Sequence, residues 1–194
     1  MKLQIKNLVM DRLVDLIKVY DNALDSNVCE YLIELFENKE DVHERLENNR
    51  KPNFTQINLT EISEESPDVQ DAHSIVLKSV LRYKKDYYSF IDERCFPESH
   101  TFEQFRIKKY NADGNDAFDT HVDVTDYDSS RRFLSFLFYL NDVNDGGETV
   151  FKEKIIKPKT GKLVIFPPLW MYPHYGKEPV SNTKYILSTY LHYK

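Results

Sequence analysis

The residues of this chain that could support the most demanding chemistry are His121, Asp123 two positions later, and His174 much further along. Two imidazoles and one carboxylate are the ligand set that holds a ferrous ion on one face and leaves positions open for a co-substrate and dioxygen. In an extended segment, alternate side chains point to the same side, so His121 and Asp123 would share one face of a strand. His174 must then arrive from a distant strand. The pattern predicts a catalytic iron site.

A lysine after the second histidine indicates what the co-substrate would carry. Lys184 lies ten positions beyond His174. Its ammonium is the cation that an iron site needs if its co-substrate has a carboxylate at the far end. We therefore expect 2-oxoglutarate, bound to the metal through its 2-oxo group and C1 carboxylate and paired with Lys184 through its C5 carboxylate. Dioxygen would take the last coordination position.

A histidine two positions before an aspartate also occurs on ordinary protein surfaces, so other segments must support the site. The chain has such segments in a fixed order: Tyr139-Leu140-Asn141-Asp142, Gly146-Gly147-Glu148-Thr149-Val150-Phe151, Pro158 to Gly161 before Leu163-Val164-Ile165-Phe166, His174-Tyr175-Gly176, and Pro179-Val180. Together with the candidate ligands and the lysine, they resemble the iron(II)- and 2-oxoglutarate-dependent oxygenases of the prolyl 4-hydroxylase type. The resemblance covers roughly residues 100–194 well and the N-terminal part more loosely.

The resemblance implies further roles. In the similar hydroxylases a tyrosine before the metal-binding tripeptide and a hydroxyl residue on the next strand help to hold the co-substrate, and Tyr110, Ser135 and Tyr139 occupy the matching positions. Related halogenases have a small residue where this chain has Asp123, so hydroxylation is expected. The family chemistry converts 2-oxoglutarate to succinate and carbon dioxide while an unactivated C–H bond is hydroxylated, and ascorbate is the expected reductant.

The resemblance is weaker at the positions that would bind the prime substrate. Arg132 and His192 match substrate-side residues of the prolyl hydroxylases, whereas Tyr190 replaces a tryptophan and Phe118 replaces a tyrosine. We expect Arg132, Tyr190 and His192 to contact the prime substrate. The leading expectation is a peptidyl proline.

Two alternatives stay open. A free amino acid or another small metabolite would need a closed pocket with a charged anchor for its carboxylate, and Arg132 could serve as that anchor. A different class is a non-catalytic or cupin-like metal-binding jelly roll that needs no 2-oxoglutarate. Lys184, Tyr139 and Ser135 argue against this second alternative. Arg132 could also be only an exposed charge at a strand end.

The chain divides into a mostly helical part, residues 1–100, and a β-rich part, residues 101–194. From Thr101 onward, runs of alternating polarity are separated by Gly, Asp and Asn clusters, which is typical of an antiparallel jelly roll whose two sheets enclose a pocket. The predicted fold class is α+β and mainly β: a double-stranded β-helix with N-terminal supporting helices. We expect residues 1–194 to form a single domain.

Local patterns place the supporting elements. Residues 28–36 predict a helix, residues 54–59 a strand, residues 13–19 either of the two, and the charged residues 37–51 a helix end and loop. A long helix should begin at Pro67 and end near Phe96. Its buried stripe would contain Val69, Ala72, Val76, Val80, Tyr83, Tyr87 and Phe90.

Alternation also assigns faces to two strands near the site. In residues 132–140 the pocket-facing set would be Phe133, Ser135, Leu137 and Tyr139, opposite Leu134, Phe136, Phe138 and Leu140. In residues 184–192 it would be Lys184, Ile186, Ser188, Tyr190 and His192. The co-substrate cation and candidate substrate residues then lie on the same side as the metal.

Composition excludes some partners. The formal net charge is −6 over 194 residues, whereas a dedicated nucleic-acid binder would normally show a basic patch or stripe. No apolar run reaches the length of a membrane span and no signal peptide is evident, so we expect a cytoplasmic protein without membrane contact. A peptide, a protein or a small molecule is the expected partner. Two polar loops, residues 111–116 and 125–130, could be lids over the site or merely turns.

Overall fold

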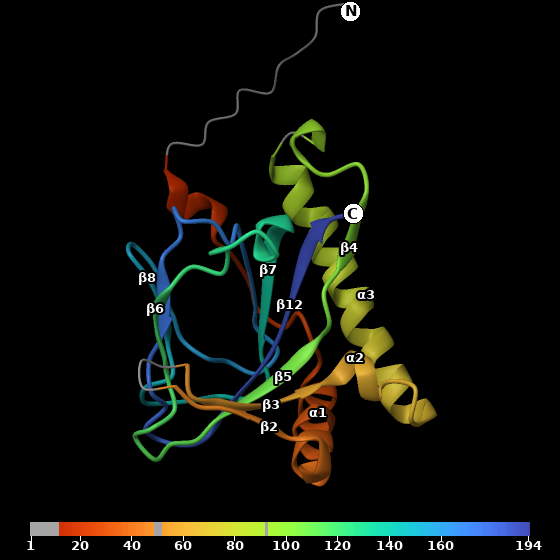
Figure 1. The fold of residues 1–194 in the computed structure, drawn as a ribbon, viewed down its shortest axis with the longest axis vertical. Helices are drawn as coiled ribbons and strands as arrows, with labels where there is room; N and C mark the ends of the chain where they lie inside the picture. Colours follow the sequence, from red (N-terminus) through yellow and green to blue (C-terminus); the bar gives the residue numbers. More distant parts are fainter. Residues whose placement is uncertain (1–11, 49–51, 92) are drawn as a thin grey trace, which may run out of the picture.

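Two antiparallel sheets face each other in the computed structural model, which describes residues 12–48, 52–91 and 93–194. The larger sheet has the order β1-β10-β7-β12-β5-β3-β2, with β4 pairing to β12, and the smaller has the order β6-β11-β8-β9 (Figure 1). The strands are β1 (Lys18–Tyr20), β2 (Glu44–Leu46), β3 (Phe54–Asn58), β4 (His100–Phe102), β5 (Arg106–Tyr110), β6 (Phe118–His121), β7 (Arg132–Tyr139), β8 (Thr149–Phe151), β9 (Ile155–Ile156), β10 (Leu163–Phe166), β11 (His174–Gly176) and β12 (Lys184–Tyr193). The prediction of a mainly antiparallel β fold is confirmed.

Helices cover one face of the larger sheet (Figure 1). They are α1 (Ser26–Asn38), α2 (Leu59–Ile62) and α3 (Pro67–Phe90), with single 3₁₀ turns at Leu13–Leu16, Glu40–Val42, Glu93–Cys95 and Ser129–Arg131. Buried apolar residues of α1 and α3 join those of β7 and β12 in one hydrophobic cluster. A second cluster lies between the two sheets, around the candidate site. Burial of each large apolar side chain contributes about 1.5–3 kcal/mol to the free energy of folding, so the first cluster stabilises the packing of the helices on the large sheet. Among the described residues, no helix combines the length and the apolar character needed to span a bilayer.

The long helix α3 begins where its sequence signals it. The Ser66 hydroxyl accepts a hydrogen bond from the Val69 backbone N–H, and Pro67 occupies the first turn, where its missing N–H costs nothing. Its buried residues are Val69, Ala72, Val76, Val80 and Tyr87. The helix ends at Phe90, earlier than expected. The prediction that Tyr83 and Phe90 belong to the buried stripe was wrong, because Tyr83 is only partly buried and Phe90 is 44% exposed, with the Lys18 amine over its ring.

The charged segment after α1 contains a strand that local patterns did not indicate. β2 pairs with β3, and Arg45 of β2 donates to the carboxylate of Asp116, with 2.7 Å between Arg45 Nη2 and Asp116 Oδ1. Asp116 is fully buried, so this long-range ion pair stabilises a strand that looks solvated in isolation. Residues 49–51 of the expected loop lie outside the described residues.

The faces of β7 are as predicted except at Phe133. Ser135 and Leu137 line the cavity between the sheets, and the opposite set joins the helical cluster. The register with β12 shifts between Leu191 and His192, which leaves Phe133 as an extra residue. Phe133 therefore packs on the helical side, where its ring lies 5.4 Å from that of Phe96.

Candidate metal and co-substrate site

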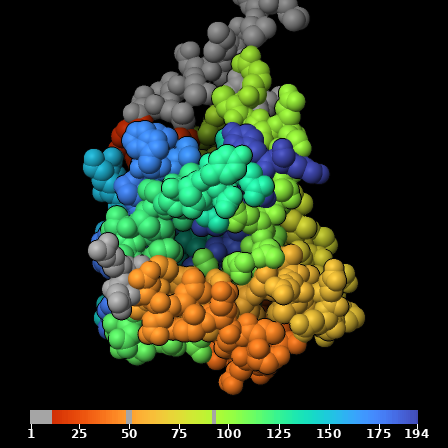
Figure 2. All heavy atoms as spheres, viewed as in Figure 1, coloured from red at the N-terminus to blue at the C-terminus, as the bar shows by residue number. Residues whose placement is uncertain are grey.

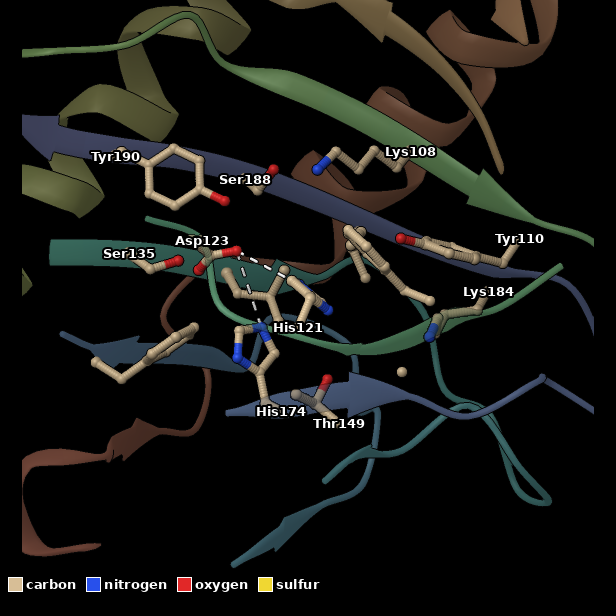
Figure 3. A pocket seen from close by; sticks show the side chains of 15 residues that line it. Lys108, Tyr110, His121, Asp123, Ser135, Thr149, His174, Lys184, Ser188 and Tyr190 are labelled. Carbon is tan, nitrogen blue, oxygen red and sulfur yellow. Dashed lines mark ion pairs between the residues drawn. The ribbon is translucent and has the colours of Figure 1, made fainter. Parts of the chain in front are cut away.

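The three predicted ligands converge where the smaller sheet faces β12 (Figure 3). His121 ends β6, His174 begins β11, and the two are direct partners in the strand register. Asp123 follows β6, with its Oδ1 at 3.4 Å from His121 Nε2 and 4.0 Å from His174 Nε2. The three ligand atoms all lie within 4.8 Å of one another.

Backbone carbonyls orient both imidazoles toward this point. The Nδ1 atom of His121 lies 2.7 Å from the Asp119 carbonyl oxygen, and that of His174 lies 3.1 Å from the Tyr172 carbonyl oxygen. Because a carbonyl can only accept, Nδ1 carries the proton in each ring and the Nε2 lone pair is left for a metal. The Asp123 Oδ2 atom is buried and has no hydrogen-bond partner in the part of the chain that the structure describes. This donor set fits Fe(II).

The protonation states favour metal binding as well. Burial opposes ionisation of Asp123, but the neighbouring imidazoles of His121 and His174 hold the pKa of its carboxyl below the usual value. Burial lowers the pKa of His174. A metal needs the carboxylate and the neutral imidazole, and the site favours both forms.

Lys184 points into the same cavity from the start of β12 (Figure 3). Its side chain is buried, its Nζ donates to the Gly147 carbonyl oxygen at 3.1 Å, and Nζ lies 4.4 Å from the ring centroid of Tyr110. Burial lowers its pKa to about 8, against the opposing charge of Glu148. Gly147 has φ of 73°, a conformation suited to glycine, which accounts for the paired glycines of this turn. One carbonyl leaves most of the ammonium's donor capacity for a ligand.

The expected co-substrate residues differ in their placement. Tyr110 and Ser135 line the cavity, as predicted. Tyr139 is fully buried behind it, where its hydroxyl donates to Thr149 Oγ1 at 2.6 Å, and Thr149 lines the cavity in its place. Thr149 belongs to the Gly-Gly-Glu-Thr segment that contributes to the family resemblance. The sequence therefore already marked this position, although no role was predicted for Thr149.

The three residues expected to bind the prime substrate also differ in their position relative to the cavity. Tyr190 lines the cavity. Arg132 is held outside it: Nε and Nη2 donate to the Glu103 carboxylate at 2.8 and 3.0 Å, and Nη1 donates to the Asp123 carbonyl oxygen at 2.8 Å. The Arg132 guanidinium stacks over the Tyr190 ring at 4.1 Å. His192 does not line the cavity, and its Nδ1 is buried without a partner among the described residues.

Sequence reasoning missed a second lysine in the cavity. Lys108 lies two positions before Tyr110 on β5, so both side chains face the same way, and its amine points toward Ser188 and Tyr190 (Figure 3). Burial lowers its pKa to about 8. The alternation that assigned Tyr110 could have revealed it.

Hydrogen bonds of a buried residue hold each of the two polar loops, Asp116 in the first and Ser129 in the second. Asp116 accepts from the Asn111 backbone N–H at 2.9 Å as well as from Arg45. In the second loop, the buried Ser129 hydroxyl donates to Asp126 Oδ1 at 2.7 Å. These contacts brace each loop, and the lid hypothesis stays a prediction.

Comparison with known proteins agrees with this geometry. Residues 105–192 match the family model described as the 2OG-Fe(II) oxygenase superfamily. A protein of Arabidopsis thaliana described as "Probable prolyl 4-hydroxylase 9" is 31% identical over an alignment of 118 residues, which covers 56% of this chain and 40% of that protein. The chain thus spans well under half the length of this relative.

Solved structures share the fold. A viral collagen prolyl hydroxylase from Paramecium bursaria Chlorella virus-1, in a 2OG complex, superposes with a TM-score of 0.70 at 19% identity, over 92% of this chain and 96% of that chain. A Trichoplax adhaerens prolyl hydroxylase, in complex with a hypoxia inducible factor oxygen degradation domain peptide fragment, gives a TM-score of 0.72 at 18% identity, over 96% and 88% of the two chains. The segment that matches the family model contains the metal triad and Lys184, so the similarity to the 2OG-Fe(II) oxygenase superfamily falls on the residues that form the site.

Proposed function

We propose that this protein is an Fe(II)- and 2-oxoglutarate-dependent dioxygenase that hydroxylates an unactivated C–H bond, with a prolyl residue as substrate. One observation carries the proposal: the metal triad and the buried cation Lys184 line a single cavity. A metal-binding jelly roll that needs no co-substrate has no reason to bury a lysine beside its metal, because burying an ammonium is costly unless a partner compensates it.

When bound, Fe(II) supplies the oxidation that couples dioxygen and 2-oxoglutarate to hydroxylation, with succinate and carbon dioxide as products. The residues of the chain hold and orient the reactants. Lys184 pairs with the C5 carboxylate, and the hydroxyls of Ser135 and Thr149 offer hydrogen bonds along the co-substrate. Phe118 stacks on the His121 ring, with centroids 3.6 Å apart and planes 9° apart, so the metal ligand cannot rotate freely.

The prolyl substrate is supported by the names of the relatives and by the shape of the surface. Figure 2 shows a hollow bordered by the teal atoms of the loop before β7, through which blue atoms of the last strand are visible. A prolyl ring could reach the metal through such an opening. A structural neighbour is a prolyl hydroxylase in complex with a peptide fragment. Ascorbate as reductant and a cytoplasmic location belong to the same proposal.

Succinate formation tests this function. The purified chain, Fe(II), ascorbate and 2-oxoglutarate should release succinate in air, and proline compounds should stimulate the release and gain one oxygen atom by mass spectrometry. The panel should contain internal-proline peptides, C-terminal-proline peptides and free L-proline. Matched compounds without proline serve as controls; if these alone stimulate succinate release, the oxygenase assignment stands and proline is rejected as the substrate. Absence of Fe(II)-dependent succinate formation would reject the function.

A further inference from the structure

Lys108 is a partly buried cation of the active-site cavity. Its side chain lines the cavity, and no hydrogen bond or ion pair joins its amine to another residue of the described ranges. Its Nζ lies 5.1 Å from the centroid of the Phe54 ring, and Asp123 supplies an opposing charge in the same cavity. By comparison, the neighbouring Lys109 faces outward and pairs with Glu37 at 2.8 Å. An ammonium that lines the cavity and has no hydrogen-bond or ion-pair partner among the described residues is free to bind a ligand of negative charge.

Charge balance indicates that this ligand is an anion other than 2-oxoglutarate. Fe(II) and Asp123 together leave one positive charge. The two carboxylates of 2-oxoglutarate would cancel that charge and the charge of Lys184. Lys108 then remains unbalanced in the fully loaded site. Arg132 and Glu103 neutralise each other outside the cavity, so they do not alter this balance.

The position of Lys108 indicates where the anion would bind. Figure 3 shows its amine on the side of the cavity that contains Ser188 and Tyr190, above Asp123, whereas Lys184 lies at the other side beside Tyr110. The buried hydroxyl of Ser188 lies next to the amine and offers a second donor. The co-substrate extends from the metal toward Lys184. The Lys108 side is therefore left to the prime substrate.

We propose that Lys108, with Ser188, binds a carboxylate of the prime substrate. This inference rests on the proposed function, because it assigns the cavity on the Lys108 side to that substrate. Since the amine lies within the metal cavity itself, the carboxylate must belong to the same residue as the oxidised carbon. For a prolyl substrate that group is the α-carboxylate, either of free proline or of a peptide's C-terminal proline. An internal proline has an amide there and offers no anion.

Acetate and acetamide test the subsite without a known substrate, because they have the same shape and differ in charge. The protein would be loaded with Mn(II) and saturating 2-oxoglutarate, and relaxation of the probe's methyl protons by Mn(II) would report binding near the metal. In the wild type, acetate should bind at least tenfold more tightly than acetamide. Lys108→Met keeps the length of the side chain and removes its charge, so the preference should disappear. Lys108→Arg should retain part of it, and Lys109→Met should behave as wild type.

Calorimetric titration of 2-oxoglutarate separates the two possible anions. Its affinity in Lys108→Met should stay within twofold of wild type. A parallel tenfold loss of 2-oxoglutarate affinity would show that Lys108 serves the co-substrate, and equal acetate binding in wild type and Lys108→Met would show that it serves no anion. Either result overturns the inference. Thermal unfolding of each variant verifies that it is folded.

L-proline, L-prolinamide and acetyl-glycyl-proline with a free or amidated C-terminus then identify the source of the carboxylate. Binding of L-proline alone indicates the free amino acid, and binding of both acids indicates a terminal residue. If acetate binds as expected but no proline compound does, the prolyl assignment fails and the anion subsite stands. If amidated proline peptides are hydroxylated equally by wild type and Lys108→Met, the prolyl function stands and the inference about Lys108 fails.

Discussion

At the scale of single residues, each group of the site has a contact outside the metal centre that fixes its protonation or its orientation. His121 and His174 each use Nδ1 on a backbone carbonyl, so the metal-binding atom is determined before any metal arrives. Lys184 is fixed by one carbonyl and by the Tyr110 ring. These contacts make the contribution of each residue separable by substitution.

Lys184→Met should weaken 2-oxoglutarate binding by about 2–4 kcal/mol, the usual cost of leaving a buried carboxylate without its partner. Mn(II) affinity should change little, since the amine is not a metal ligand. Calorimetric titration of each ligand measures both effects. Equal 2-oxoglutarate affinity in wild type and variant would mean that the co-substrate is anchored elsewhere.

Binding of 2-oxoglutarate should depend on pH through the same residue. The pKa of Lys184 is lowered to about 8 in the free protein, and pairing with a carboxylate must raise it. Binding is therefore strongest below pH of about 8 and weakens as pH rises through the free and then the bound pKa, by at most tenfold per pH unit. Titrations between pH 7 and 9.5 (about one unit below and more than one above the free pKa) would show this decline. A constant affinity over that range would mean that the ammonium is not used.

At the scale of elements, strand pairing and one cross-strand hydrogen bond position groups of the cavity wall. β7 supplies Tyr139, which reaches β8 and holds the Thr149 hydroxyl at the cavity wall. The start of β7 supplies Arg132, which holds the backbone of Asp123. Tyr139 therefore acts on the cavity through Thr149, and Arg132 acts on it through Asp123.

Thr149→Val should destabilise the fold by about 1–3 kcal/mol, because the buried Tyr139 hydroxyl loses its acceptor while the shape is kept. Thr149→Ser restores an acceptor and should recover most of the loss. Denaturant unfolding measures the difference between the two variants. If Val and Ser are equally stable, the Tyr139–Thr149 bond contributes nothing and Tyr139 has another role.

Arg132→Ala distinguishes positioning from substrate binding. Because the guanidinium holds Glu103 and the Asp123 carbonyl, its loss should reduce Mn(II) affinity by roughly tenfold or more, as for other partners of metal ligands. Mn(II) titration by electron paramagnetic resonance measures this directly. Unchanged metal affinity combined with a raised KM for the prime substrate would support the substrate role that the resemblance implied.

At the scale of the whole molecule, the features that the sequence did not predict depend on contacts between distant segments. Local spacing indicated that His121 and Asp123 lie together and alternation assigned the face of Lys184, whereas His174 was identified through the ordered segments that resemble the oxygenase family. Phe133 changes face because of a bulge that depends on the partner strand. Lys108 looks like an ordinary solvated lysine beside Lys109. Alternation places it on the same face as Tyr110, and the packing of the two sheets makes that face a wall of the cavity. The Arg45–Asp116 pair joins residues that no local pattern relates.

That long-range pair should contribute to global stability. Arg45→Met leaves the buried Asp116 carboxylate with only its Asn111 contacts, so we expect a loss of about 3 kcal/mol in the free energy of unfolding. Arg45→Lys should lose less, because it keeps the charge. Chemical denaturation compares the two. A loss below about 0.5 kcal/mol for Arg45→Met, the range of an exposed pair, would show that the pair is solvated in solution.

The central claim is that His121, Asp123 and His174 form the metal site of an oxygenase. Its most direct test is the Mn(II) stoichiometry of wild type, His174→Ala and the control His100→Ala, whose imidazole lies on β4 away from the cavity. We predict one Mn(II) per chain in wild type and in His100→Ala, and none retained in His174→Ala. Full occupancy in His174→Ala would contradict the assignment of the site.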